Sequence, residues 1–412
     1  MNLTLPRDFH ESSTRLAGSD RIAHVHVFED FAAAEFHWRW LEREHAAATP
    51  YQQYDLLELW QRNVGQRAGY MPFIVVGCDT AGQPLFLWPF GKVKKGLVRT
   101  LQFLGANHVN FNFGLWRRDA AATITAMDIR KTFRQATDDG REFDLILLRN
   151  QPKIWGDVTN PFALLPHSQS PNNGRRMDLS APGTELINQQ LSGSMRRKLR
   201  AKQRRLMELP NYRYFRASAP GEVDGFLNEF FKLKSMHFSA LGLKNVFEQP
   251  GVEPFVRKAC HRGLANGRPL IEVHVLEADG QMLAMFAGTS SGGRFTTMFN
   301  TYTLSQHARQ SPGVVLLQHM ISDLADRGFK SFDLGIGEAK YKAVFCKQPE
   351  LLFDTLLPLT SLGGMAAFVL TTASSLKRVV KQNPTFWAGV QAFRRRAFGK
   401  RCRTINFSGE DS

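Results

Sequence analysis

The stretch FIVVGCDTAGQPLFLWPF (residues 73–90) predicts a β-hairpin, and the same plan returns in LIEVHVLEADGQMLAMFAG (270–288). Each copy has an apolar run, a polar turn and a second apolar run, as expected of two antiparallel strands joined by a short turn. Gly82 in the first turn matches Gly280 in the second at an offset of 198 residues. An internal repeat of this kind indicates the architecture of a chain more directly than any single motif. We therefore interpret the chain as two copies of one structural unit.

A helix and a further strand follow each predicted hairpin. Residues 121–140 and 313–328 carry apolar side chains at roughly helical spacing, and each segment stops at a glycine. The strands that come next share the letters FDL, at 143–145 and at 332–334, an offset of 189. The sequence therefore predicts an α/β (α+β) fold made of two βαβ-type halves.

The domain boundaries are predicted from length and composition. A chain of 412 residues is too long for one ordinary hydrophobic core. The segment SQSPNNGRRMDLSAPG is rich in Ser, Pro, Asn and Gly, which is typical of a linker. We expect five parts: an N-terminal arm (1–22), a first half (23–167), a linker (168–190), a second half (191–360) and a basic helical tail (361–412).

The positive charge is concentrated in two places. The net charge is +16, with seven Lys/Arg within 196–205 and nine within 377–403, where no acid occurs, so the remaining chain is neutral. This distribution argues against a folded body built to bind DNA. The run SMRRKLRAKQRRL (194–206) predicts an amphipathic helix, capped by Ser192 or Ser194, with an apolar stripe of Met195, Leu199 and Leu206.

The cysteines and the termini suggest the compartment. Cys78, Cys260, Cys346 and Cys402 lie far apart without CxxC spacing, so we expect reduced thiols and no metal site. The polar start of the chain does not have the pattern of a signal peptide. No apolar stretch reaches the roughly 18 residues of a membrane span. We therefore expect a cytoplasmic protein.

The sharpest chemical signal lies between residues 294 and 321. RFTTMFNTYT predicts a strand, and LSQHARQSPGVVLLQHMI leads into a helix with Pro312 in its first turn. Free N–H groups at a helix start favour phosphate. We expect the amides of Gly313, Val314 and Val315 as donors, with Arg309 adding charge. An ordinary capped helix start is the alternative.

Residues 310–315, QSPGVV, resemble the Q/R-x-x-G-x-G/A loop of the GNAT acyltransferases, which binds the pyrophosphate of acetyl-CoA; Val315 stands where that loop has a small residue. The wider pattern resembles the CelD-type acetyltransferases associated with cellulose and exopolysaccharide biosynthesis. The matching segments are TPYQQYDLLELW (49–60), LGANHVNFNFGL (104–115), 194–206, SPGVVLLQHMI (311–321) and FDLGIGEAKYKAVF (332–345). The two halves are also similar to FemABX-type transferases.

This resemblance implies two tandem GNAT-like domains, each a mixed, mostly antiparallel sheet flanked by helices. It implies an acyl-CoA co-substrate, most simply acetyl-CoA, and no metal. The expected cofactor contacts are Asn300 and Thr301 along the thioester arm, and Arg309, Gln310, Ser311, Gly313, Val314 and Val315 at the pyrophosphate.

Acyl transfer requires a base, polarisation of the thioester and an acid for the thiolate. Glu338 or Asp333 is the expected base and Tyr341 the expected acid, while Lys342 would hold a phosphate or an anionic acceptor. The cations of the basic run, among them Arg196, Arg197 and Arg200, are expected to line the cleft between the halves and bind the acceptor or the CoA phosphates. A solvated helix face is the alternative. The histidines at 237, 274, 307 and 319 form no recognisable catalytic pattern.

Three functions remain open from the sequence. The first is an acyl-CoA-dependent acyltransferase acting on a hydroxyl or amine of a polysaccharide or cell-envelope precursor. The second is a FemABX-like transferase that takes its donor from an aminoacyl-tRNA. The third is a non-catalytic scaffold that docks on a membrane-bound polysaccharide synthase. The tail carries Phe386, Trp387 and Phe393 among its cations, which suits a contact with the surface of the inner membrane.

Overall fold

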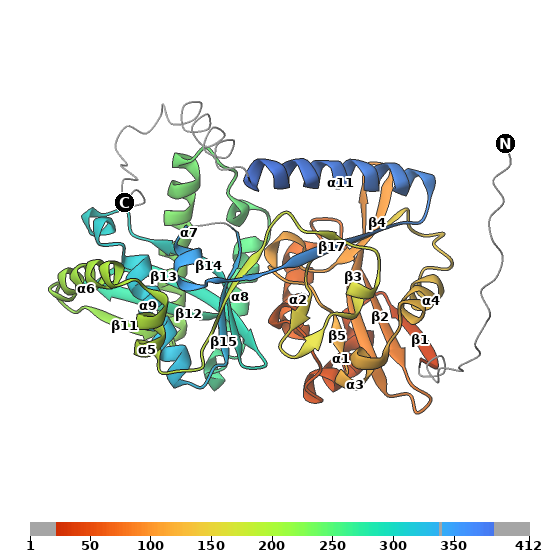
Figure 1. Cartoon of the computed structure of the whole chain (residues 1–412), viewed down its shortest axis with the longest axis horizontal. Helices are drawn as coiled ribbons and strands as arrows, with labels where there is room; N and C mark the ends of the chain where they lie inside the picture. The colour runs from red at the N-terminus through yellow and green to blue at the C-terminus, as the bar shows by residue number, and fades with distance from the viewer. Residues whose placement is uncertain (1–21, 338–339, 383–412) are drawn as a thin grey trace, which may run out of the picture.

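The computed structural model describes residues 22–337 and 340–382, and it contains two large sheets that lie side by side (Figure 1). The first sheet has the order β1 (His24–Phe28), β2 (Met71–Cys78), β3 (Pro84–Lys95), β4 (Val98–Phe103), β6 (Leu145–Pro152), β17 (Leu352–Pro358) and β9 (Ser168–Gln169), with β5 (Leu115–Trp116) on β3. The second has the order β11 (Arg213–Arg216), β12 (Glu272–Ala278), β13 (Gln281–Ser291), β14 (Arg294–Tyr302), β15 (Ser331–Ile336), β10 (Gly174–Asp178) and β16 (Gln348–Glu350). Strands β7 (Ile154–Trp155) and β8 (Val158–Thr159) form a separate pair.

The predicted internal repeat is confirmed by strand pairing. The two quoted stretches form the antiparallel hairpins β2–β3 and β12–β13. In each sheet the next strand is antiparallel, and the strand after the following helix is parallel to it: β4 with β6, and β14 with β15. The helices that make these crossovers are α4 (Ala126–Ala136) and α9 (Pro312–Asp326). The predicted α/β class with two halves of one plan is therefore correct.

The predicted linker and the predicted end of the second half need correction, because the halves exchange their last strands. Residues 168–190 contain β9, β10 and helix α5 (Gly183–Gln190), and β10 pairs with β15 of the second sheet. In return, β17 leaves the second half and pairs with β6 of the first sheet. Each exchanged strand covers the open edge of a parallel strand, whose unpaired backbone groups would otherwise remain exposed. The sequence does not predict this exchange, because the residues of β10, GRRMD, are mostly polar and do not have the pattern of a buried strand.

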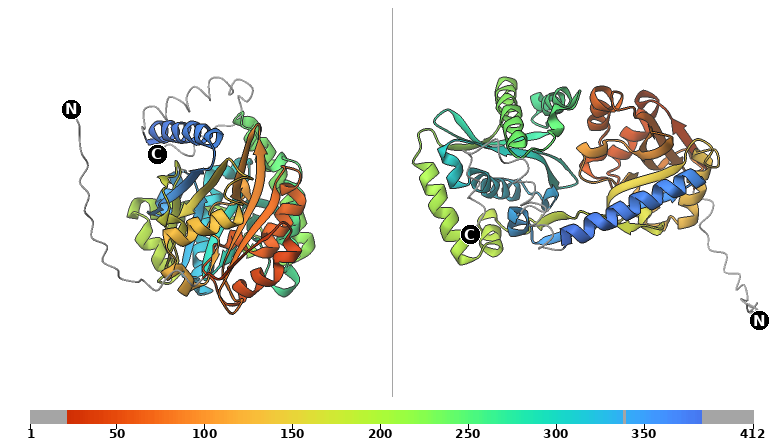
Figure 2. Two further views of the ribbon diagram at one scale, coloured as in Figure 1. Left: turned by 90° about the vertical axis from the view of Figure 1, so that its right-hand side faces the viewer. Right: turned by 90° about the horizontal axis from the view of Figure 1, so that it is seen from above.

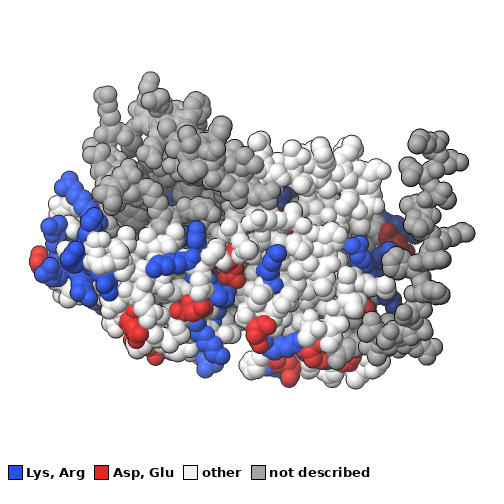
Figure 3. Space-filling view, viewed as in Figure 1, with Lys and Arg blue, Asp and Glu red and all other residues white. Residues whose placement is uncertain are grey.

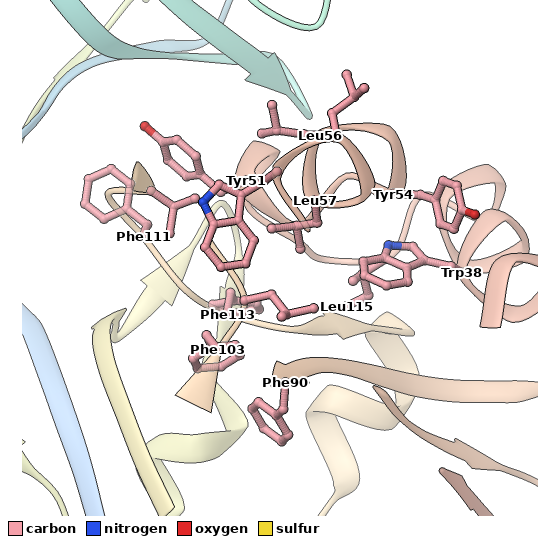
Figure 4. Packing of buried hydrophobic residues seen from close by; sticks show 14 of the residues in the cluster. Trp38, Tyr51, Tyr54, Leu56, Leu57, Phe90, Phe103, Phe111, Phe113 and Leu115 are labelled. Carbon is pink, nitrogen blue, oxygen red and sulfur yellow. The ribbon is translucent and has the colours of Figure 1, made fainter. Parts of the chain in front are cut away.

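Helices cover both faces of the second sheet. On one face α5, α6 (Gly193–Met207) and α9 enclose a small core of their own. On the other face α7 (Pro220–Ala240) and α8 (Val252–His261) belong to a larger core that continues into the first half. There it includes α1 (Phe31–Arg43), α2 (Tyr54–Trp60) and the aromatic side chains of β3, β4 and the loop before β5 (Figure 4). The two halves are thus joined by a continuous apolar interior.

The remaining helices are short or peripheral. Helix α3 (Arg118–Thr123) precedes α4, and α10 (Lys340–Phe345) follows β15. Helix α11 (Ser361–Gln382) lies on the outside of the first half (Figure 1). None of the helices in the described part of the chain has the length and hydropathy needed to cross a membrane.

A glycine at the contact between the halves gives a first prediction. Gly251, just before α8, has φ +85, and a Cβ there would lie 1.8 Å from the carbonyl oxygen of Asn63 in the first half. We expect Gly251→Ala to lower the free energy of unfolding by about 2–3 kcal/mol, because both the backbone conformation and the close approach exclude a side chain. Urea unfolding of the whole chain measures this loss.

Gly280→Ala is the matched control for Gly251→Ala. Gly280 also has a positive φ, +66, but nothing lies within 4 Å of a Cβ at this position. It should cost about 1 kcal/mol, the penalty of the left-handed conformation alone. Equal losses for the two variants would show that the approach of the two halves at Asn63 contributes nothing.

Candidate active site

The central feature of the second sheet is an opening between β14 and β15. The two parallel strands pair only at Arg294–Ser331, Phe295–Phe332 and Thr296–Asp333. Beyond these pairs β14 continues to Tyr302 and β15 to Ile336. An irregularity in the β13–β14 register at the Ala287–Gly288 step redirects β14 where the opening begins. The strands therefore separate toward their C-terminal ends, the edge at which ligands bind in open α/β sheets.

A side chain from the first half lies at the start of this opening. The Asn110 amide nitrogen donates to the carbonyl oxygen of Thr297 on β14 at 3.0 Å and to the hydroxyl of Tyr51 at 2.7 Å. It also lies 2.5 Å from where a Cβ on Gly335 of β15 would stand. The first half thus helps to hold the two strands apart.

Helix α9 begins beside the end of β14, where the sequence predicts a phosphate site. The segment η7 (Gln306–Gln310) leads to Ser311 in the left-handed region, and α9 starts at Pro312. The amides of Val314 and Val315 bond to the Ser311 carbonyl at 2.9 and 3.2 Å. These two expected donors are thus engaged within the first turn. The amide of Gly313 has no acceptor inside the helix because of its position at the helix start.

The basic run reaches this helix start. Lys202 on α6 donates from Nζ to the Ser311 hydroxyl at 2.7 Å. Burial, with a smaller contribution from Lys198, lowers the pKa of Lys202. A cation beside the positive end of a helix dipole is destabilised unless an anion joins it. Lys202 and the first turn of α9 therefore form a cationic surface suited to phosphate.

Helix α6 itself differs from the expectation in two ways. Ser192 is the cap, accepting from the amide of Met195 at 3.3 Å, and Leu199 and Leu206 are buried, but Met195 is exposed. The helix also lies at the end of the molecule farthest from the first half (Figures 1 and 2). It packs on the α9 face of the sheet, where its two leucines join the core.

The basic side chains of α6 therefore do not line a cleft between the halves. The Lys/Arg of α6 form the patch at the left of Figure 3. Arg196 donates to the carbonyl of Asn188 at 3.2 Å, whereas Arg197 and Arg200 are exposed on α6. Arg309, expected at the pyrophosphate, is exposed on η7, next to Gln310.

Asp333, one of the two expected bases, is fully buried in an ion pair. It accepts from Arg294 Nε at 2.8 Å, Thr296 Oγ1 at 2.7 Å and the Gly335 amide at 2.9 Å. Arg294 also pairs with Glu350; burial opposes its charge, but the two carboxylates hold its pKa above its usual range.

The repeat places a similar pair in the first half. Asp144, of the first FDL motif, accepts from Arg99 Nε at 3.1 Å. The two pairs differ in register, because Asp333 lies opposite Thr296 and bonds to Arg294 two residues away, whereas Asp144 bonds to both the amide and the side chain of Arg99. Asp333 is thus held by its own set of buried partners. Its geometry does not support a base at the opening.

The other expected catalytic residues lie around the end of β15. Tyr341 Oη accepts from the side-chain amide of Asn300 on β14 at 3.0 Å, so it lies across the opening from the expected thioester strand. Lys342 donates from Nζ to the carbonyl of Ile336 at 2.9 Å. Glu338 lies outside the described residues. Tyr341 is thus the expected catalytic side chain that the fold brings to the opening.

His237, to which the sequence gives no role, lies near the same place. It is in the last turn of α7, with its ring centroid 5.0 Å from that of Tyr302 at the end of β14. Its Nε2 is buried without a hydrogen-bond partner, and so is the hydroxyl of Thr301. Burial, followed by the charge of Lys234, lowers the pKa of His237 to about 4. A buried polar atom without a partner is uncommon and calls for an explanation such as a ligand.

A separate cavity of about 460 Å³ lies between the halves. It is lined by Arg39, Gln52 and Trp155 of the first half and by Ser290, Arg294 and Lys330 near the turn before β14. The cavity lies beside Arg294, the first residue of β14, about 10 Å along the strand from Thr297, where the opening begins.

One cluster of metal-ligand residues occurs among the described residues, formed by Glu272, His274 and Asp323. Arg327 donates to Glu272 at 2.7 Å and to Asp323 at 3.0 Å from the same nitrogen. The carboxylates are therefore already paired with a cation, and the cluster is explained as an ion-pair network.

Residues 193–343 match a family described as acetyltransferase (GNAT) domain. Among solved structures, FemX is similar with a TM-score of 0.55 and 11% sequence identity. The match covers 81% of this chain and 97% of the FemX chain. A second similar structure is the C-terminal domain of a protein from Agrobacterium fabrum that is described as a putative lysylphosphatidylglycerol synthetase. It has a TM-score of 0.51 and 12% sequence identity, and the match covers 84% of this chain and 97% of that domain. No curated protein matches the sequence. The chain therefore has a FemX-like fold of two sheets flanked by helices, and residues 193–343 of its second half are similar to GNAT acetyltransferase domains.

Proposed function

We propose that this protein transfers an acyl group, most simply acetyl, from acyl-CoA to a hydroxyl or amine of a polysaccharide or cell-envelope precursor. The observation that supports the donor is the opening between β14 and β15, with the start of α9 and Lys202 at its end. The CelD-type resemblance of the motifs supports a polysaccharide acceptor.

The residues of the opening fit acyl-CoA in two parts. The gap between the strands leaves backbone groups of β14 without partners on β15, and these can bond the amide-containing arm of the donor. The Gly313 amide, Ser311 and Lys202 can bind the pyrophosphate, whose negative charge would offset the cation at the helix start. Partial burial of Lys202 strengthens this interaction, because it reduces the screening of the charge by water.

The chemistry needs a proton acceptor and a proton donor on opposite sides of the thioester. The acceptor oxygen or nitrogen attacks the thioester carbonyl, the C–S bond breaks, and the proton of the acceptor passes to His237 Nε2. His237 suits this step because it is neutral above a pH of about 4. Tyr341, oriented by Asn300, donates its proton to the departing thiolate. Amides of β14 polarise the thioester carbonyl.

Acetyl-CoA binding tests the donor site. Lys202→Glu should weaken binding at least tenfold, because it replaces a cation at the phosphates with an anion, and Gly313→Glu should do the same. Arg204→Glu makes the same charge change two residues further along α6, where the exposed side chain lies on the opposite face of the helix, and we expect an unchanged Kd. Isothermal titration calorimetry measures all four proteins. No binding by the wild type, or equal binding by all variants, would contradict the proposal.

A second candidate is transfer from an aminoacyl-tRNA, which the exposed cationic face of α6 favours. Its exposed Lys/Arg could bind RNA phosphates, and binding would then weaken steeply with salt. Helix α6 has no aromatic residue for stacking on bases. A gel shift with total tRNA decides between the two donors: a salt-sensitive complex without acetyl-CoA binding would favour tRNA.

A further inference from the structure

Helix α11 follows the exchanged strand β17 and is attached to the first sheet by one end. It contacts β17, β6 and β4. At Gly363 a Cβ would lie 1.6 Å from the carbonyl oxygen of Asp144, so the helix backbone is in close contact with the chain just before β6. The Gly363 amide also donates to Thr360 Oγ1 at 3.1 Å. The start of α11 is therefore fixed to the body of the protein.

The opposite side of α11 carries an apolar stripe that faces outward. Met365, Phe368, Val369 and Leu376 follow one another at helical spacing, and their exposed fractions are 63%, 73%, 64% and 65%. Apolar residues at this spacing normally face a core. Seen from above, α11 instead lies on the surface of the molecule (Figure 2). The side chains of 361–376 include no Asp, Glu, Lys or Arg.

The charge of the sequence that follows indicates what the stripe contacts. Residues 377–403 contain nine Lys/Arg and no Asp or Glu, together with Phe386, Trp387 and Phe393. An apolar helix face combined with a cationic segment suits a bilayer that contains anionic lipids, where acyl chains receive the apolar residues and headgroup phosphates attract the cations. A water-soluble partner would need an apolar groove and an acidic surface together.

We propose that α11 is a docking helix for an anionic membrane surface. Phe368, Val369 and Leu376 enter the boundary between headgroups and acyl chains, and the positive charge of the sequence that follows α11 favours anionic lipid. Because Gly363 fixes the start of α11, the docked helix orients the whole protein on the membrane. This inference does not depend on the identity of the acyl donor.

Co-sedimentation of the full chain with vesicles tests this proposal. Vesicles of phosphatidylcholine and phosphatidylglycerol in equal parts should bind at least tenfold more protein than vesicles of phosphatidylcholine alone. The double variant Phe368→Glu/Val369→Glu should bind at least tenfold less. Phe36→Glu is the matched control, because Phe36 is 72% exposed on α1, on the side of the first half opposite α11 (Figure 1), and should leave binding unchanged.

Each other outcome overturns the proposal. Equal binding to both kinds of vesicle, or none, excludes recognition of anionic lipid. If the double variant binds vesicles as well as the wild type does, the apolar stripe of α11 has no role in membrane binding. A dimer in vesicle-free solution that the double variant dissociates, seen by light scattering, would show that a second copy covers the stripe. Faster hydrogen exchange in α11 after deletion of 383–412 would show that the tail covers it.

Discussion

Asp333→Asn should lower the free energy of unfolding by about 3–5 kcal/mol, because it removes one partner of a buried ion pair and leaves Arg294 in the interior with less compensating charge. Asparagine has nearly the same shape, so the loss reports charge and not volume. Urea unfolding measures this loss, provided that the dependence of the unfolding free energy on urea concentration is the same in the variant and the wild type.

The repeat supplies the control for this variant. Asp144→Asn removes the same carboxylate from the first half, where Arg99 is 46% exposed and solvent screens the pair. We expect less than half of the loss caused by Asp333→Asn. Under conditions in which Asp333→Asn is folded, its kcat should match the wild type. A folded variant that has lost its activity would restore Asp333 as the base.

His237→Gln should lower kcat for acyl transfer by about 10²–10⁴-fold, the usual contribution of a general base. Glutamine cannot accept the proton, but it retains a polar group of similar size. The Kd for acetyl-CoA should stay unchanged, because glutamine keeps the size and polarity of the side chain. His319→Gln is the matched control: His319 is half-buried, and its Nε2 bonds to Tyr212 at 3.0 Å on the other face of the sheet. An unchanged kcat for His237→Gln would exclude the role.

The pH dependence of the same residue has a definite sign. An unfolded histidine takes up a proton near pH 6.5, whereas the pKa of folded His237 is about 4. Between these values the unfolded chain binds more protons, so the contribution of His237 to stability is present above pH 6.5 and lost as the pH falls toward 4. The slope of stability against pH in this window should decrease in His237→Gln. Catalysis by a neutral His237 should likewise persist at pH 5.

The elements of this site that depend on local sequence could be predicted. The hairpins, the crossover helices and the start of α9 at Pro312 follow from patterns a few residues long, because a turn, a cap or an apolar period is encoded where it occurs. The same is true of Tyr341, whose place after β15 follows from its motif. The structure places Asp333 in a buried ion pair. The sequence could not show this, because a carboxylate at the end of a strand looks the same whether it contacts a substrate or a buried arginine.

Residue patterns by themselves determined that this chain contains two copies of one α/β unit, and they predicted a helix start suited to an anion in the second copy. Tertiary structure alone decided which strand completes which sheet, that Lys202 meets Ser311, and that His237 lies at the end of β14. These contacts join residues up to about two hundred positions apart. Their formation depends on which surfaces the whole chain can bury together, and no local period records that.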